Sequence, residues 1–125
     1  METFLDVIEM ALEYNDPEIS TKACEILGKK RQASEKGIKT LQELLKDESC
    51  CESARATLIE IAKEDNSILY DFLLCHDPTI RKIARDELMT VENLNNILKV
   101  IFEGNNEVII NEALSDLHRF SDSII

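Results

Sequence analysis

Hydrophobic and polar residues follow one twelve-residue pattern that occurs four times along the chain. The copies begin at residues 16, 47, 77 and 106, so successive starts are 31, 30 and 29 residues apart. Apolar residues fill the fourth, eighth and twelfth positions, which lie on one side of a helix. The fourth positions are Ile19, Cys50, Ile80 and Ile109, the eighth are Ala23, Ala54, Ala84 and Ala113, and the twelfth are Leu27, Leu58, Leu88 and Leu117. Each copy is therefore predicted to form a helix with one buried stripe, where the alanines let a neighbouring helix come close.

The first position of each copy holds a residue that caps helices well. These residues are Asp16, Asp47, Asp77 and Asn106. A side-chain oxygen at this position accepts a hydrogen bond from a free backbone N–H of the first turn. Pro17 and Pro78 follow at the first helical position, where a missing N–H costs nothing. We therefore expect a helix to begin directly after each of the four caps.

A second amphipathic segment precedes each copy, at residues 2–14, 35–46, 66–76 and 91–103. In the first segment the apolar face carries Leu5, Ile8 and Leu12, and the polar face carries Glu2, Asp6, Glu9 and Glu13. The longest break between units is residues 28–37, where Gly28 suits the end of the preceding helix. Each unit is thus predicted to be a helix hairpin, which buries its apolar face by stacking on its siblings.

Paired helices joined by a turn that ends in "DP", with an arginine and then an alanine on the second helix, resemble HEAT repeats. The spacing of about thirty residues is similar to that of the short, phycobilisome-lyase-like repeats. The segment "DPTIRKIARDEL" matches best, with Arg81 at the arginine position of the family, whereas Ser20, Cys51 and Ile110 replace it elsewhere. The resemblance implies an all-α fold, a right-handed α-α superhelix of four antiparallel helix pairs. It implies one domain, 1–125, with repeats at approximately 1–30, 31–62, 63–90 and 91–125.

The chain is acidic, with 25 Asp and Glu against 14 Lys and Arg and a net charge of −11. Such a field repels a nucleic-acid duplex, so no nucleic-acid partner is expected. Residues 1–21 hold six acids and no Lys or Arg, which favours a protein partner with a basic patch. Apolar runs are far shorter than the ~20 residues that span a bilayer, and the N-terminus lacks the basic start of a secretory signal. We expect a cytoplasmic protein without membrane contact.

The residues that carry chemistry do not form a recognisable catalytic or metal-binding motif. The cysteines at 24, 50, 51 and 75 contain no C-x-x-C pair, so we interpret them as reduced, small apolar residues. In "CHD" at 75–77, Asp77 is assigned to helix capping and His76 to a turn, and consecutive residues do not converge on one substrate atom. The sequence predicts no catalytic residue, no metal, no cofactor and no enzyme activity.

The remaining functional surface is the side of the second helices opposite the buried stripe. It is predicted to form a concave, protein-binding row of Thr21, Glu25, Glu52, Arg55, Lys82, Arg85, Asp86, Asn111 and Ser115. The predicted function is a non-enzymatic scaffold or adaptor for protein–protein interaction. An ordinary solvated face is the competing interpretation. Two other functions stay open: a lyase-like or chaperone-like accessory subunit that presents a cofactor or client, with Cys24 or Cys51 as an exposed thiol, and a purely structural subunit.

Both ends of the chain carry apolar residues outside the narrow stripes. At the N-terminal end these are Phe4, Val7 and Met10, and at the C-terminal end Phe120, Ile124 and Ile125. A stacked repeat protein normally ends in a polar cap. Self-association through these ends is therefore an expectation beside binding of another protein.

Overall fold

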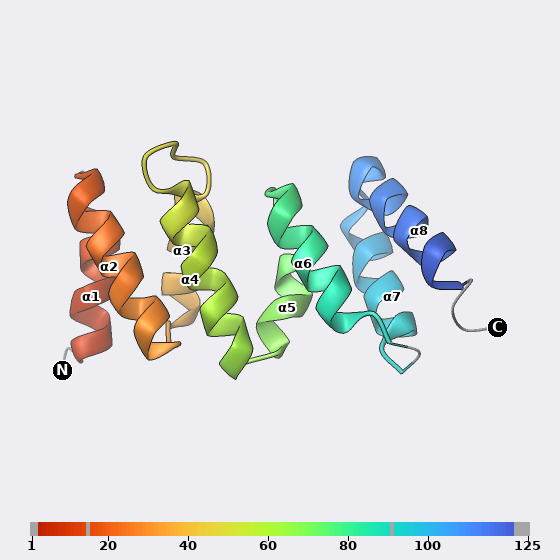
Figure 1. Ribbon diagram of the computed structural model, residues 1–125, viewed down its shortest axis with the longest axis horizontal. Helices are drawn as coiled ribbons and strands as arrows, with labels where there is room; N and C mark the ends of the chain where they lie inside the picture. Colours follow the sequence, from red (N-terminus) through yellow and green to blue (C-terminus); the bar gives the residue numbers. More distant parts are fainter. Residues whose placement is uncertain (1–2, 15, 91, 122–125) are drawn as a thin grey trace. The chain divides into compact units, whose positions relative to one another are not determined.

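The computed structural model describes residues 3–14, 16–90 and 92–121, which form eight helices and no strand (Figure 1). The helices are α1 (Phe4–Leu12), α2 (Pro17–Lys30), α3 (Glu35–Leu44), α4 (Cys51–Glu64), α5 (Ser67–Phe72), α6 (Pro78–Leu88), α7 (Leu94–Gly104) and α8 (Glu107–Ser121). The all-α prediction is confirmed. None of the described helices is both long and apolar enough to cross a membrane.

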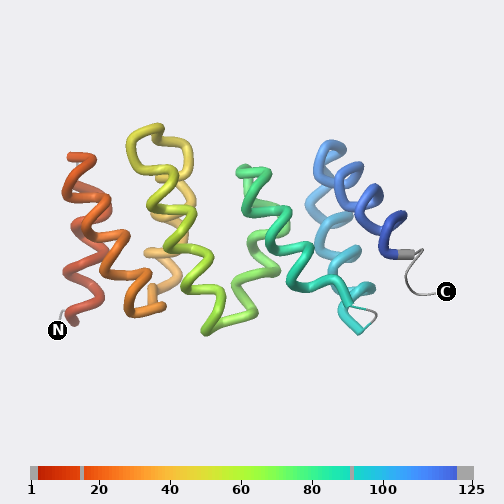
Figure 2. The backbone as a smooth tube through the Cα atoms, viewed as in Figure 1, coloured from red at the N-terminus to blue at the C-terminus, as the bar shows by residue number. Residues whose placement is uncertain are grey.

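The helices belong to two compact units, Met1–Asn66 and Ser67–Ile125. In the first unit α1 packs against α2 and α3 against α4, while α2 also packs against α4 and α1 against α3. The tube trace shows α2 and α4 running in the same direction (Figure 2). In the second unit α5 packs against α6, α7 against α8, and α6 against α7. Within the first unit, therefore, the two first helices form one layer and the two second helices form another.

Three of the four predicted caps begin their helices as expected. Asp16 accepts a hydrogen bond from the Glu18 N–H, and Asp77 and Asn106 each accept two from the first turn that follows them. Asp47 is the exception: its Oδ1 accepts the Ser49 N–H at 2.8 Å as predicted, but α4 begins only at Cys51. The Asp47 carbonyl accepts both Cys50 N–H at 3.0 Å and Cys51 N–H at 2.8 Å, so one tighter turn precedes the regular helix.

The predicted buried stripe is confirmed at its alanines and wrong at Ile19, and Leu117 is only half-buried. The four alanines Ala23, Ala54, Ala84 and Ala113 are at most 2% exposed. Ile19, by contrast, is 37% exposed. The reason is visible in the next copy, where Cys50 lies with its Sγ 3.9 Å from the Pro17 carbonyl oxygen of α2. Cys50 thus faces the preceding hairpin of its own unit, and no described element lies on the corresponding side of Ile19.

The linker predicted at residues 28–37 is shorter in the structure. Helix α2 runs on to Lys30 and ends at Arg31, whose φ of 53° places it in the left-handed region. Gly28 therefore lies inside α2 rather than at its end. A Cβ at Gly28 would lie 3.3 Å from Thr57 Oγ1 of α4, and that hydroxyl donates to the Cys24 carbonyl at 2.7 Å. The glycine therefore permits close packing of α2 on α4. The prediction that it ends the helix is wrong.

Glu9 was predicted on the polar face of the first helix, but it is only 9% exposed. Its Oε2 accepts the Ser34 N–H at 2.7 Å, and its Oε1 accepts the Ser34 hydroxyl. Ser34 in turn accepts the Gly37 N–H at 3.1 Å and caps α3. The carboxylate of α1 therefore holds the start of α3, which fixes the first-helix layer of this unit.

Candidate functional site

A groove of about 840 Å³ runs between α2 and α4 in the first unit. Small residues contributed by both helices, among them Gly28, Ser53, Ala56 and Thr57, line it. Its other lining residues are charged: Glu25, Lys29, Lys30, Arg31, Glu52, Glu60 and Glu64. The small side chains leave the space open, and the charged ones can contact a ligand that enters it.

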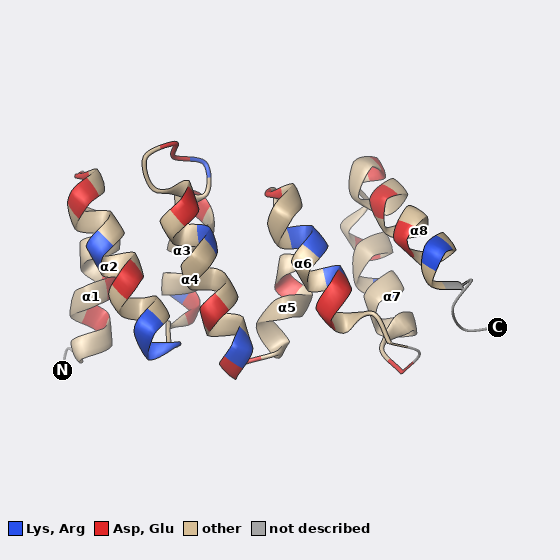
Figure 3. Cartoon of the chain, viewed as in Figure 1, with Lys and Arg blue, Asp and Glu red and all other residues tan. Residues whose placement is uncertain are grey.

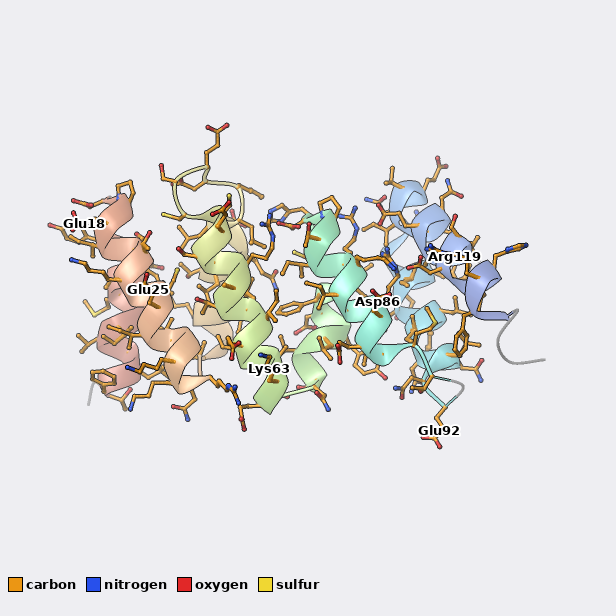
Figure 4. All side chains as sticks on the ribbon, viewed as in Figure 1. Glu18, Glu25, Lys63, Asp86, Glu92 and Arg119 are labelled. Carbon is orange, nitrogen blue, oxygen red and sulfur yellow. The ribbon has the colours of Figure 1, made fainter. Side chains whose placement is uncertain are left out.

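One part of the groove is neutralised by ion pairs within the chain. Arg31 Nε lies 3.1 Å from Glu60 Oε2, and its Nη1 lies 3.2 Å from Glu64 Oε1. Glu60 also accepts from Lys63 at 2.8 Å, and this hydrogen bond holds the pKa of Glu60 below its ordinary value. Figure 4 places Lys63 toward the end of α4 and Glu25 about midway along α2.

Two further acidic residues that line the groove, Glu25 and Glu52, are both exposed. Among the described residues, no cation forms an ion pair with either carboxylate. Figure 3 shows acidic and basic positions alternating along α2 and α4. The groove thus offers two acids to a basic side chain of a ligand, beside small residues and the exposed Lys29 and Lys30.

The structure brings only part of the predicted row together. Glu25 and Glu52 line the groove of the first unit, while Lys82 and Asp86 line a smaller hollow of about 360 Å³ in the second. The Lys82 Nζ and Asp86 Oδ1 atoms are paired at 2.9 Å. The rest of the predicted row lines neither space: Thr21 and Arg55 are half-buried, and Asn111 and Ser115 are exposed.

Arg85 does not belong to an exposed row, because only 4% of it is accessible. Its Nε donates to Asp116 Oδ2 of α8 at 2.5 Å, and its Nη1 donates to Glu112 Oε1 at 3.3 Å. One turn earlier on α6, Arg81 makes two bonds to the Glu112 carboxylate, at 2.9 and 3.0 Å. Arg81 also donates to the Cys75 carbonyl at 2.8 Å, which fastens the turn between α5 and α6.

Sequence reasoning missed Glu112 and Asp116, the partners of these arginines. The hydrogen bond of Arg81 lowers the pKa of Glu112. Burial acts to raise the pKa of Asp116, but the hydrogen bond and charge of Arg85 outweigh it, and the net shift is downward. The signal was present in the spacing: both pairs are 31 residues apart, and both members repeat after four residues on their own helix.

The cysteines differ in accessibility. Cys24 is fully buried, and burial raises the pKa of its thiol to about 12. The suggestion that Cys24 is an exposed thiol is therefore wrong, whereas Cys51 is half-buried. In the "CHD" segment Cys75 and Asp77 are buried and His76 is exposed. In the part of the chain that the structure describes, no group of three or more His, Cys, Asp or Glu residues is placed to hold a metal ion.

The N-terminal apolar residues are exposed as predicted, with Phe4 at 64%, Val7 at 50% and Met10 at 59%. Phe120 is half-buried, and the predicted exposure of Ile124 and Ile125 concerns positions outside the described residues.

Comparisons of this chain with protein-family models, with curated proteins and with solved structures found no match. The assignment of a function therefore depends on the chain's own repeat and on the groove.

Proposed function

We propose that this chain is a short, HEAT-like α-solenoid that binds a protein partner without catalysing a reaction. In this proposal the four hairpins form a right-handed superhelix in a cytoplasmic protein, and the second helices present the binding surface. The observation that carries it is the groove between α2 and α4, where small residues form the floor and Glu25 and Glu52 are free of partners within the described chain.

The groove suits an extended or helical peptide segment better than a compact small molecule. It lies between two helices, and its lining combines small side chains with charged ones. Carboxylates on such a surface select a partner by charge complementarity and raise its association rate. A lysine or arginine of the partner would contact Glu25 and Glu52, while its backbone lies over Ala56.

The test is affinity capture with a charge-reversed protein. The Glu25→Lys/Glu52→Lys variant has a net charge four units more positive, and so does the control Glu92→Lys/Glu103→Lys, whose exposed sites lie in the other unit. Figure 4 shows Glu92 pointing away from the helices. We expect a protein that is captured by the unmodified chain and the control but lost with the groove variant. Equal capture by all three proteins, or capture of nothing specific, would contradict the proposal.

A further inference from the structure

Helix α1 carries a second apolar surface, its outer face, formed by Phe4, Val7, Met10 and the following Tyr14. These four side chains are between 50% and 64% exposed. The spacing of three residues places Phe4, Val7 and Met10 along one side of α1, and Tyr14 follows just after the end of the helix. Leu12, on another side of α1, is 1% exposed and belongs to the core. The helix is therefore apolar on two sides, of which only one is covered by described residues.

An exposed stripe of this kind is more informative than scattered exposed residues. Single apolar side chains on a surface need no explanation, whereas a contiguous patch commonly marks an interaction site. The stripe combines a phenylalanine, a tyrosine and a methionine. Aromatic rings supply much of the energy at protein interfaces, and methionine adapts its shape to different partners. The composition of the outer face is thus that of a docking surface.

The charges around the outer face indicate what docks there. Residues 1–21 contain no Lys or Arg, and Asp6, Glu13, Asp16 and Glu18 are all exposed. Glu13 and Glu18 pair with the exposed lysines Lys36 and Lys22, at 3.8 and 3.2 Å, so Asp6 and Asp16 are the main acids open to a partner. The Thr3 hydrogen bonds lower the pKa of Asp6. Two copies joined by their outer faces through a two-fold axis would place the same acids against each other, which is repulsive. The acids instead complement a basic partner.

We propose that the outer face of α1 docks a cationic amphipathic helix of another protein. The apolar side of that helix covers Phe4, Val7 and Met10, with anchors three or four residues apart, and its lysines or arginines lie near Asp6 and the acids that begin α2. The inference rests on the proposed function in so far as both make the chain a protein-binding module. The outer face and the groove are different surfaces, so an experiment can contradict the inference without contradicting the proposed function.

The probe is a fluorescent 18-residue peptide of leucine and lysine, patterned to be apolar on one side and basic on the other when helical. Its anisotropy is titrated with the full chain, beside a leucine–glutamate peptide of the same pattern. The decisive variants are Val7→Asp and Val108→Asp, because both remove an exposed valine and add one negative charge. Added negative charge by itself strengthens attraction to the lysine peptide, so only loss of an apolar contact weakens binding. Phe4→Ser provides a second variant without a charge change.

We expect saturable binding of the lysine peptide that weakens with salt, and much weaker binding of the glutamate peptide. Val7→Asp and Phe4→Ser should each weaken binding by about tenfold, the size expected for a central interface residue. Val108→Asp should change it by less than about twofold, since an exposed charge contributes little. Circular dichroism melts establish that each variant is folded.

Three results would overturn the inference. The first is equal affinity of the Val7→Asp and Val108→Asp variants for the lysine peptide. The second is normal binding of the lysine peptide by Val7→Asp, while Glu25→Lys/Glu52→Lys loses more affinity for it than Glu92→Lys/Glu103→Lys does. That result would place the cationic helix in the groove and leave the proposed function intact. The third is absence of peptide binding together with a dimer, seen by sedimentation, that Val7→Asp dissociates, because a second copy would then occupy the outer face.

Discussion

Replacing Arg81 by methionine tests how far a buried ion pair holds the second unit together. The side chain of Arg81 is 7% exposed, and the substitution removes two bonds to Glu112 and one to the Cys75 carbonyl. Removing one partner of a buried pair costs about 3–5 kcal/mol. Glu112 is 31% exposed and keeps Arg85 at 3.3 Å, so it can be partly rehydrated and stays partly paired. We therefore expect a loss of about 2–3 kcal/mol in the free energy of unfolding.

The assay is urea denaturation of the full chain followed by far-ultraviolet circular dichroism. The control is Lys82→Met on the same helix, since Lys82 is 47% exposed and its pairs with Asp86 at 2.9 Å and Asp116 at 3.8 Å should together contribute less than about 1 kcal/mol. The double variant Arg81→Met/Glu112→Met leaves no unpaired charge at this contact. It should therefore be more stable than Arg81→Met alone by about 1 kcal/mol. An Arg81→Met cost below about 0.5 kcal/mol, or simple additivity in the double variant, would refute the reasoning.

Three further predictions concern other contacts. A Cβ at Gly37 would lie 2.5 Å from Glu9 Oε2, so Gly37→Ala should destabilise the chain in thermal melts. In a Glu9→Ala background this clash is absent, and the higher helix propensity of alanine should raise the free energy of unfolding by about 0.5–1 kcal/mol. Destabilisation in both backgrounds would contradict this prediction. A thiol reagent at neutral pH should label Cys51 quickly and Cys24 only after unfolding, because burial keeps the latter protonated with a pKa of about 12; rapid labelling that survives Cys51→Ser would contradict the burial. Because the pKa of Glu112 is lowered in the folded chain, this carboxylate contributes its full stabilisation above its ordinary pKa of 4.5. The contribution is lost as the pH falls through the lower pKa of the folded chain. The melting temperature of Glu112→Gln should consequently fall less than that of the unmodified chain between about pH 5 and about pH 3; parallel falls would exclude this contribution.

The parts of the fold that were predictable are those that depend on neighbouring residues. Asp16, Asp77 and Asn106 cap their helices through side-chain bonds to the next two or three residues, so the sequence contains the whole interaction. The alanines of the stripe were predicted from periodicity, although their burial comes from packing against other helices. Ile19 obeys the same pattern and is nevertheless exposed, because the preceding hairpin that covers Cys50 has no described counterpart beside Ile19.

The errors occur where a contact joins helices far apart in sequence. Glu9 fits the polar face of α1 by periodicity, and only its hydrogen bonds to Ser34, 25 residues later, explain its burial. Arg85 fits an exposed row equally well until Asp116 is known to face it. A single helix wheel does not distinguish a solvated charge from a charge paired across helices. Comparing positions between repeat copies would have revealed the arginine partners.

The sequence placed two of the groove's lining residues on the second helices but did not predict the groove itself. Glu25 and Glu52 were both assigned to the second-helix surface, and the structure places both in one groove. Gly28 and Thr57 both line that groove and lie close to each other, whereas the sequence assigned Gly28 to a helix end. Close packing of two helices is a tertiary property, and therefore the groove became visible only with the helices in place.

The most direct test of a binding groove between α2 and α4 is hydrogen exchange of the chain with and without a partner captured as described above. At saturating partner, the account predicts slower backbone amide exchange in residues 17–31 and 51–64, with the Glu25→Lys/Glu52→Lys protein showing no slowing. Unchanged exchange in both segments while the partner is bound, with protection confined to other helices, would contradict the account.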